Sequence, residues 1–161
     1  MHVPAALSDA VAWWAAAYAD HRLLSVSIRF LHIAGLVIGG GTAIITDRAI
    51  LRGARGAADD RTAAMATLHR SHRTVVPALV LVVSTGVLLS AADVSTFFAS
   101  PIYWTKLSLV ALLLVNGAGL VAAERLAAGR NAWRRLAFGS AASLTLWIVL
   151  LFVGTLLTAS A

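Results

Sequence analysis

Apolar residues gather in four long runs along this chain, and the short stretches between the runs carry most of the charge. The runs cover residues 23–45, 74–92, 102–123 and 136–157. Each is close to the roughly 20 residues that an α-helix needs to cross a bilayer. Because the connections are short, the pattern predicts an all-α integral membrane protein. We expect one antiparallel four-helix bundle, with residues 1–161 forming a single membrane domain.

Residues 1–20 are too short to cross a bilayer, yet they have a helical stripe of apolar and aromatic side chains. The stripe consists of Leu7, Val11, Trp14 and Tyr18. It predicts an N-terminal amphipathic helix in the outer interface, with Trp13, Trp14 and Tyr18 as aromatic anchors. A cleaved signal peptide is the alternative, since Ala-Tyr-Ala before Asp20 resembles a cleavage site. Against it, the segment has no Lys or Arg.

The composition supports a membrane location. Hydrophobic residues make up 60% of the 161 residues and charged residues 12%, and the mean hydropathy is +0.84. Soluble proteins are roughly half apolar and one quarter charged. The chain has no cysteine, which excludes disulfides, thiolate metal sites and haem attached through Cys. The lipid bilayer is therefore the expected environment of most side chains.

The net charge of +6 follows the predicted topology. Arginines concentrate in two connections, between the first and second spans and between the third and fourth: Arg48, Arg52, Arg55, Arg61, Arg70 and Arg73, then Arg125, Arg130, Arg134 and Arg135. By the positive-inside rule both connections are cytoplasmic, so both termini are periplasmic if the membrane is a bacterial inner membrane. The positive charge thus indicates orientation and attraction to anionic lipid rather than nucleic-acid binding.

His32 is the most suggestive residue for function. It lies about nine residues into the first span, roughly 13 Å below the outer boundary at 1.5 Å per residue. Lys106 lies about one turn into the third span from the same side, and Arg29 is one turn outward of His32. One imidazole and two cations suit a buried haem b, with His32 as the iron ligand and Arg29 and Lys106 meeting the propionates.

Two features leave alternatives open around His32. Gly35 and Gly39 form a small-xxx-small pair, which lets either another helix or a flat ligand such as a porphyrin approach closely. His32 itself could instead hydrogen-bond to a hydroxyl across the bundle, such as Ser84 or Ser143. Arg29 and Lys106 would then extend to the outer headgroups.

Other polar residues have more ordinary interpretations. His69 and His72 are spaced i,i+3 among arginines, and we expect them to be solvated or to pair with Asp47, Asp59 or Asp60. Asp47 and Glu124, near the cytoplasmic ends of the first and third spans, are expected to pair with neighbouring arginines. In the fourth span a stripe that includes Ser140, Ser143 and Trp147 should face the bundle interior.

Three segments also carry a family resemblance: RFLHIAGLVIGGG, PALVLVVSTGVLL and SPIYWTKLSLVALLLVNG, in that order. Over residues 29–120 the chain resembles small bacterial membrane proteins of the HemJ and CopD-like type. In HemJ-type proteins the first-span histidine and the third-span lysine after a tryptophan are tied to haem b and to protoporphyrinogen oxidation. The resemblance implies these roles for His32 and Lys106, with Lys106 a second ligand or a propionate partner. CopD-like proteins imply copper import, but Met1 and Met65 are the only soft ligands.

Three functions follow as hypotheses. The first is a haem-b-binding or porphyrin-binding redox protein of the bacterial inner membrane, acting in electron transfer. The second is a non-catalytic accessory subunit of a larger respiratory or photosynthetic complex, favoured by the small residues at Gly35, Gly39, Gly117 and Gly119. The third, implied by the resemblance, is a protoporphyrinogen oxidase of the HemJ type.

Overall fold

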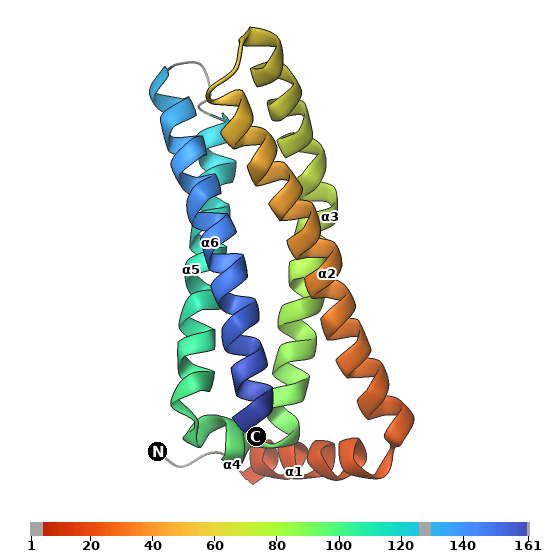
Figure 1. Ribbon diagram of the computed structural model, residues 1–161. Helices are drawn as coiled ribbons and strands as arrows, with labels where there is room; N and C mark the ends of the chain where they lie inside the picture. The colour runs from red at the N-terminus through yellow and green to blue at the C-terminus, as the bar shows by residue number, and fades with distance from the viewer. Residues whose placement is uncertain (1–4, 126–129, 161) are drawn as a thin grey trace.

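The computed structural model describes residues 5–125 and 130–160, which form six α-helices and no strand (Figure 1). Four long helices stand side by side, and α1 lies across one end of them. The helices are α1 Ala5–Asp20, α2 Arg22–Gly53, α3 Ala58–Ala92, α4 Val94–Ala99, α5 Pro101–Arg125 and α6 Arg130–Ser160.

Four of these helices are long and apolar enough to cross a membrane, namely α2, α3, α5 and residues 132–157 of α6. This confirms the prediction of four apolar helices that could cross a membrane. The helices extend beyond the apolar runs: α2 continues to Gly53 and α3 already begins at Ala58. The extensions are rich in Ala, Arg and Leu, which favour helix whether or not lipid surrounds them.

Helices α2 and α3 pack closely because glycines let their backbones approach. A Cβ atom added at Gly39 would lie 2.9 Å from the Ala78 Cβ, and one added at Gly35 would lie 2.8 Å from a Val82 methyl. Both distances are shorter than van der Waals contact allows. The small-xxx-small pair of the sequence is therefore a helix–helix contact, the geometry that such pairs commonly provide in membranes.

Helices α5 and α6 form the second close pair. Helix α2 also contacts α6 and so links the two pairs. Asn116 Nδ2 donates a hydrogen bond to the Gly139 carbonyl across α5 and α6, at 3.0 Å. On the other side of α6, Trp147 packs on Gly40, where an added Cβ would lie 3.1 Å from the indole ring. By contrast, α3 and α5 are not among the closely packed pairs of the described helices.

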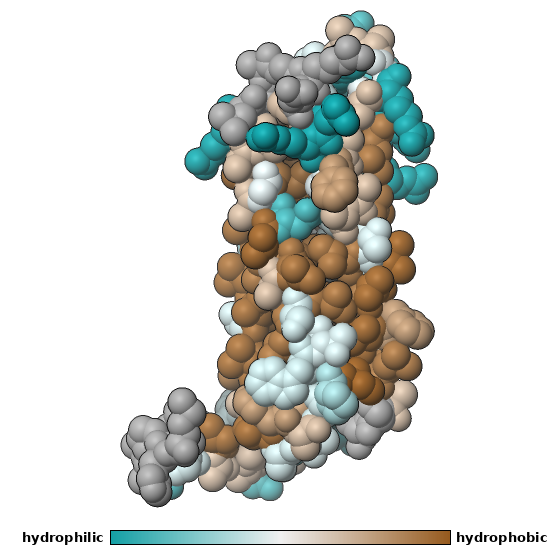
Figure 2. Space-filling view, turned by 90° about the vertical axis from the view of Figure 1, so that its left-hand side faces the viewer, coloured by the Kyte–Doolittle hydropathy of each residue, from teal (hydrophilic) through white to brown (hydrophobic). Residues whose placement is uncertain are grey.

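Buried side chains form two clusters where the four helices meet. One joins all four long helices near the α2–α3 turn and contains Ile50, Ala64, Leu68, Leu120, Ala123 and Leu136. The other surrounds Trp147 and contains Leu113 and Leu150. Most other large apolar side chains face outward, and the face in Figure 2 shows them as a broad band with hydrophilic residues towards the upper end. Such an exterior suits lipid rather than water.

The aromatic residues of α1 tie this helix to its neighbours. Trp14 Nε1 donates to the Leu88 carbonyl of α3 at 2.8 Å, and the Tyr18 hydroxyl accepts a hydrogen bond from Arg29 Nε at 2.8 Å. Trp13 is 71% exposed. The expected helix in residues 1–20 is thus present over Ala5–Asp20, but two of its three predicted anchors bind to the protein itself.

The short helix α4 lies in the connection between α3 and α5, outside the four apolar runs of the sequence. Asp93 caps it: Oδ1 accepts hydrogen bonds from the Thr96 amide at 3.2 Å and from the Ser95 hydroxyl at 3.1 Å. These bonds, chiefly those from Thr96, hold the pKa of Asp93 below its usual value. A sequence signal existed, since Asp is a preferred N-cap residue.

The glycine contact between α2 and α3 predicts a stability difference between two variants of one helix. Gly39→Leu places a side chain against Ala78 and should lower stability by about 1–3 kcal/mol, the usual cost of overpacking. Gly41→Leu is the control, because an added Cβ at Gly41 meets nothing within 4 Å. Thermal unfolding in detergent should show a lower Tm for Gly39→Leu only. An equal Tm for both variants would contradict the packing described.

Candidate functional site

A polar layer crosses the four long helices towards the α1 end of the molecule. His32 of α2 lies partly buried and contacts Thr85 of α3, with Nδ1 2.9 Å from the Thr85 Oγ1. Lys106 of α5 is also partly buried, lies close enough for its charge to act on His32, and approaches Gly154 of α6. The structure therefore brings together His32 and Lys106, which the sequence placed at a similar depth.

The hydrogen bonds of Thr85 determine which nitrogen of the His32 ring carries the proton. The Thr85 hydroxyl has one proton, and its shortest contact is 2.6 Å to the Leu81 carbonyl of its own helix. With that proton donated to Leu81, Thr85 Oγ1 accepts from His32 Nδ1–H. The neutral imidazole then has its lone pair on Nε2. This is the arrangement by which a hydrogen bond to one ring nitrogen prepares the other to bind a metal.

The two predicted cations are placed differently. Lys106 faces the layer, where a Cβ at Gly154 would lie 3.9 Å from its Nζ. Arg29 is exposed and bound to Tyr18, with its guanidinium carbon also 5.8 Å from the Tyr18 ring centroid. Arg29 thus links α2 to α1, one turn outward of His32.

Gly35 and Gly39 do not border open space near His32, because Val82 and Ala78 of α3 fill the space beside them. The sequence suggested that this glycine pair contacts either another helix or a flat ligand such as a porphyrin. The structure shows the contact with another helix. Other glycines border the layer: an added Cβ at Gly86 would be 3.4 Å from His32 Cε1. Gly86 belongs to the small polar patch at residues 84–86, and Gly154 to the polar stripe of the fourth span, but the sequence did not assign either glycine to the His32 layer.

A second polar group lies near the α2–α3 turn. Glu124 of α5 lies within ion-pair distance of both α3 histidines, with His69 Nδ1 3.3 Å from Oε1 and His72 Nδ1 3.5 Å from Oε2. The contact with His69 is also a hydrogen bond. His69 is solvated as expected, with 83% of its side chain exposed. Among the described side chains, however, the ionic partner of both histidines is Glu124 rather than Asp47, Asp59 or Asp60, and Glu124 pairs with histidine rather than arginine. No group of three or more His, Cys, Asp and Glu in the described residues has the geometry of a metal site.

Asp47 is also placed differently from expectation. It is 2% exposed, and within the described ranges it forms no ion pair with an arginine. The hydroxyls of Ser140 and Ser143 on α6 face it. Ser140 is 0% exposed, Ser143 5% and Trp147 2%, which confirms that this stripe of α6 faces the interior.

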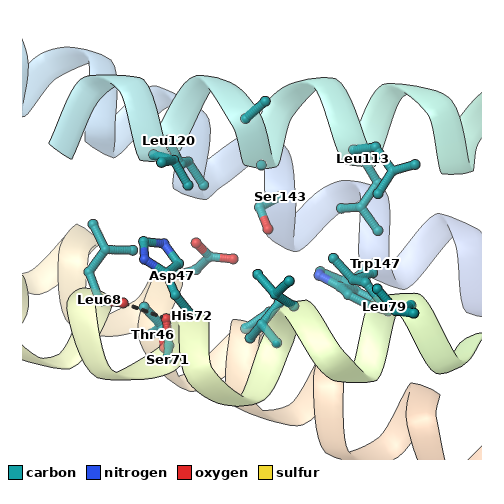
Figure 3. A pocket seen from close by; sticks show the side chains of 18 of the residues that line it. Thr46, Asp47, Leu68, Ser71, His72, Leu79, Leu113, Leu120, Ser143 and Trp147 are labelled. Carbon is teal, nitrogen blue, oxygen red and sulfur yellow. Dashed lines mark hydrogen bonds between the residues drawn. The ribbon is translucent and has the colours of Figure 1, made fainter. Parts of the chain in front are cut away.

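A cavity of about 500 Å³ opens beside Asp47. Figure 3 shows the Asp47 carboxylate between His72 and Ser143, directed into the space that separates α3 from α5. The other labelled side chains around it are mostly apolar, including Leu79, Leu113 and Trp147. The cavity was not predicted, because its α3 and α5 walls are ordinary aliphatic sequence.

Comparison with protein-family models, with curated proteins and with solved structures finds no match for this chain.

The hydrogen bonds of Thr85 predict the tautomer of His32. In protein with ¹⁵N-labelled histidine at a pH where the rings are neutral, the His32 ring should have its proton on Nδ1. Thr85→Val keeps the side-chain shape but removes the acceptor, so the Nδ1 resonance should shift. NMR assigns the signal by comparison with His32→Gln.

Thr145→Val is the matched control, since among the described residues the Thr145 hydroxyl bonds only to the Ala141 carbonyl of its own helix, at 3.0 Å. It should leave the His32 signals unchanged. A wild-type ring with its proton on Nε2 would refute the assignment.

Proposed function

We propose that this chain is a haem-b-binding, or porphyrin-binding, redox protein of the bacterial inner membrane, with His32 as the axial ligand. The observation that carries the proposal is the His32–Thr85 hydrogen bond, through which Nδ1–H would be held by Thr85 and the lone pair of Nε2 would be available to iron. A bound haem would supply one-electron chemistry at its iron. The resemblance of residues 29–120 to HemJ-type proteins supports the same assignment.

The residues around His32 offer polar partners for such a group. His32 packs against Gly86 and Lys106 against Gly154, since an added Cβ would lie 3.4 Å from His32 Cε1 and 3.9 Å from Lys106 Nζ. Lys106 would hold a propionate or serve as a second ligand, and a partly buried ammonium gains strongly from such an anionic partner. Arg29, at the outer end of the same face, is a further propionate partner if it exchanges its bond to Tyr18.

The membrane orientation belongs to the same proposal. We place the four long helices as an antiparallel bundle, with the arginine-rich α2–α3 turn in the cytoplasm and both termini in the periplasm. In Figure 1 that turn and α1 lie at opposite ends of the long helices, which supports this orientation. His32 then lies near the periplasmic surface, and α1 lies in that interface.

An absorption spectrum of the purified protein tests the proposal. After expression with ample haem, the oxidised protein should show a Soret band and the dithionite-reduced protein an α band. His32→Ala should lose both bands, because it removes the iron ligand. Lys106→Met, which keeps the length of the side chain, should weaken haem retention or shift the bands.

His21→Ala is the control, because His21 is exposed and precedes α2. It should retain the full spectrum. Wild-type protein without a Soret band, or His32→Ala protein with an unchanged one, would overturn the proposal.

An accessory subunit of a larger membrane complex is the second candidate. It is favoured by Gly119 of α5, where an added Cβ would meet nothing within 4 Å, so that a helix of another protein could pack closely there. Extraction in mild detergent should then recover the chain with its partners. Migration as a stable monomer would argue against this candidate.

A further inference from the structure

We propose that the cavity between α3 and α5 binds a hydrophobic cation from the bilayer, with the Asp47 carboxylate as its counter-charge. This site is separate from the haem proposal, since none of the residues that line the cavity belongs to the His32–Lys106 layer. The ligand class follows from the partner that Asp47 lacks, from the walls of the cavity and from the place where it opens.

Asp47 has an unsatisfied buried oxygen. Within the described residues its Oδ2 atom is buried and has no hydrogen-bond partner, and the same is true of the Ser140 Oγ. The groups that face the carboxylate, the hydroxyls of Ser140 and Ser143, are uncharged. A buried polar atom without a partner costs free energy, and a carboxylate costs more than a neutral group. Of the titratable groups around the cavity, His72 is already directed at Glu124. No cationic side chain among the described residues pairs with Asp47, so a cationic ligand in the cavity would supply the missing counter-charge.

The walls of the cavity select against other ligand classes. Among the described residues, Asp47 and His72 are the only ionisable ones that line it, and no Lys or Arg does. An anionic headgroup would therefore meet a carboxylate with no compensating cation. Most of the lining consists of aliphatic side chains together with Trp147, which suits the apolar body of the ligand and can stack on its charged centre.

The cavity opens towards lipid. Val76, Val80 and Val83 of α3 line it and are 52%, 61% and 40% exposed, and Leu114 of α5 is 42% exposed. Across the opening Gly117 leaves further space, because an added Cβ there meets nothing within 4 Å. A volume of about 500 Å³ lies in the range of known small-molecule sites, roughly 300–1,000 Å³.

Binding of radiolabelled tetraphenylphosphonium to the purified full-length protein in mild detergent tests this site. Wild-type protein should bind it saturably, and neutral triphenylphosphine oxide should not compete. Asp47→Asn keeps the shape of the side chain but removes its charge, so it should weaken binding by about tenfold or more. Asp93→Asn is the matched control on an exposed residue and should bind like wild type.

A second pair of variants leaves Asp47 intact. Gly117→Leu fills the cavity from its α5 wall and should abolish saturable binding, whereas Gly119→Leu should not, since Gly119 borders open space but does not line this cavity. Binding that is not saturable in wild type overturns the proposal. So does equal binding by Asp47→Asn, or equal loss in both glycine variants. The haem spectrum is measured separately, so either proposal can fail alone.

Discussion

The close contact of α2 with α3 is the interaction on which both polar regions depend. Because Gly35 and Gly39 let the two backbones meet, His32 reaches Thr85 on one side of the contact. On the other side, Asp47 comes level with His72. Helix α2 packs on both α3 and α6. Because α3 packs on α2 rather than on α5, a space remains between α3 and α5. One pair of glycines thus positions an imidazole, a carboxylate and a cavity.

Hydropathy was sufficient to predict the four spans, because a bilayer acts on the apolar residues of each segment wherever they are in the fold. It could not predict how far each helix continues beyond the membrane core. Residues 58–73 are helical although they are polar, because local propensity and packing act there instead of lipid. The six-residue helix α4 was missed for a similar reason, since a single capping aspartate determines it.

The candidate site was predictable only in part. The sequence predicted similar depths for His32 and Lys106 along their two spans, and that was enough to place them in one layer. To predict Thr85 rather than Ser84 as the partner of His32, one must know how α3 is rotated about its own axis. The largely aliphatic sequence of α3 does not define that rotation. Asp47 was misassigned because its neighbours along the chain are arginines, whereas its neighbours in space are serines of a helix almost one hundred residues away.

The opening between α3 and α5 has a consequence for how any occupant of the cavity reaches it. Its rim consists of side chains such as Val80 and Leu114 that face the hydrocarbon, so access is by lateral diffusion within the membrane rather than from bulk water. Occupancy then depends on the mole fraction of the ligand in the lipid. A compound that partitions strongly into the bilayer can fill the cavity at a low aqueous concentration, even when its intrinsic affinity is modest.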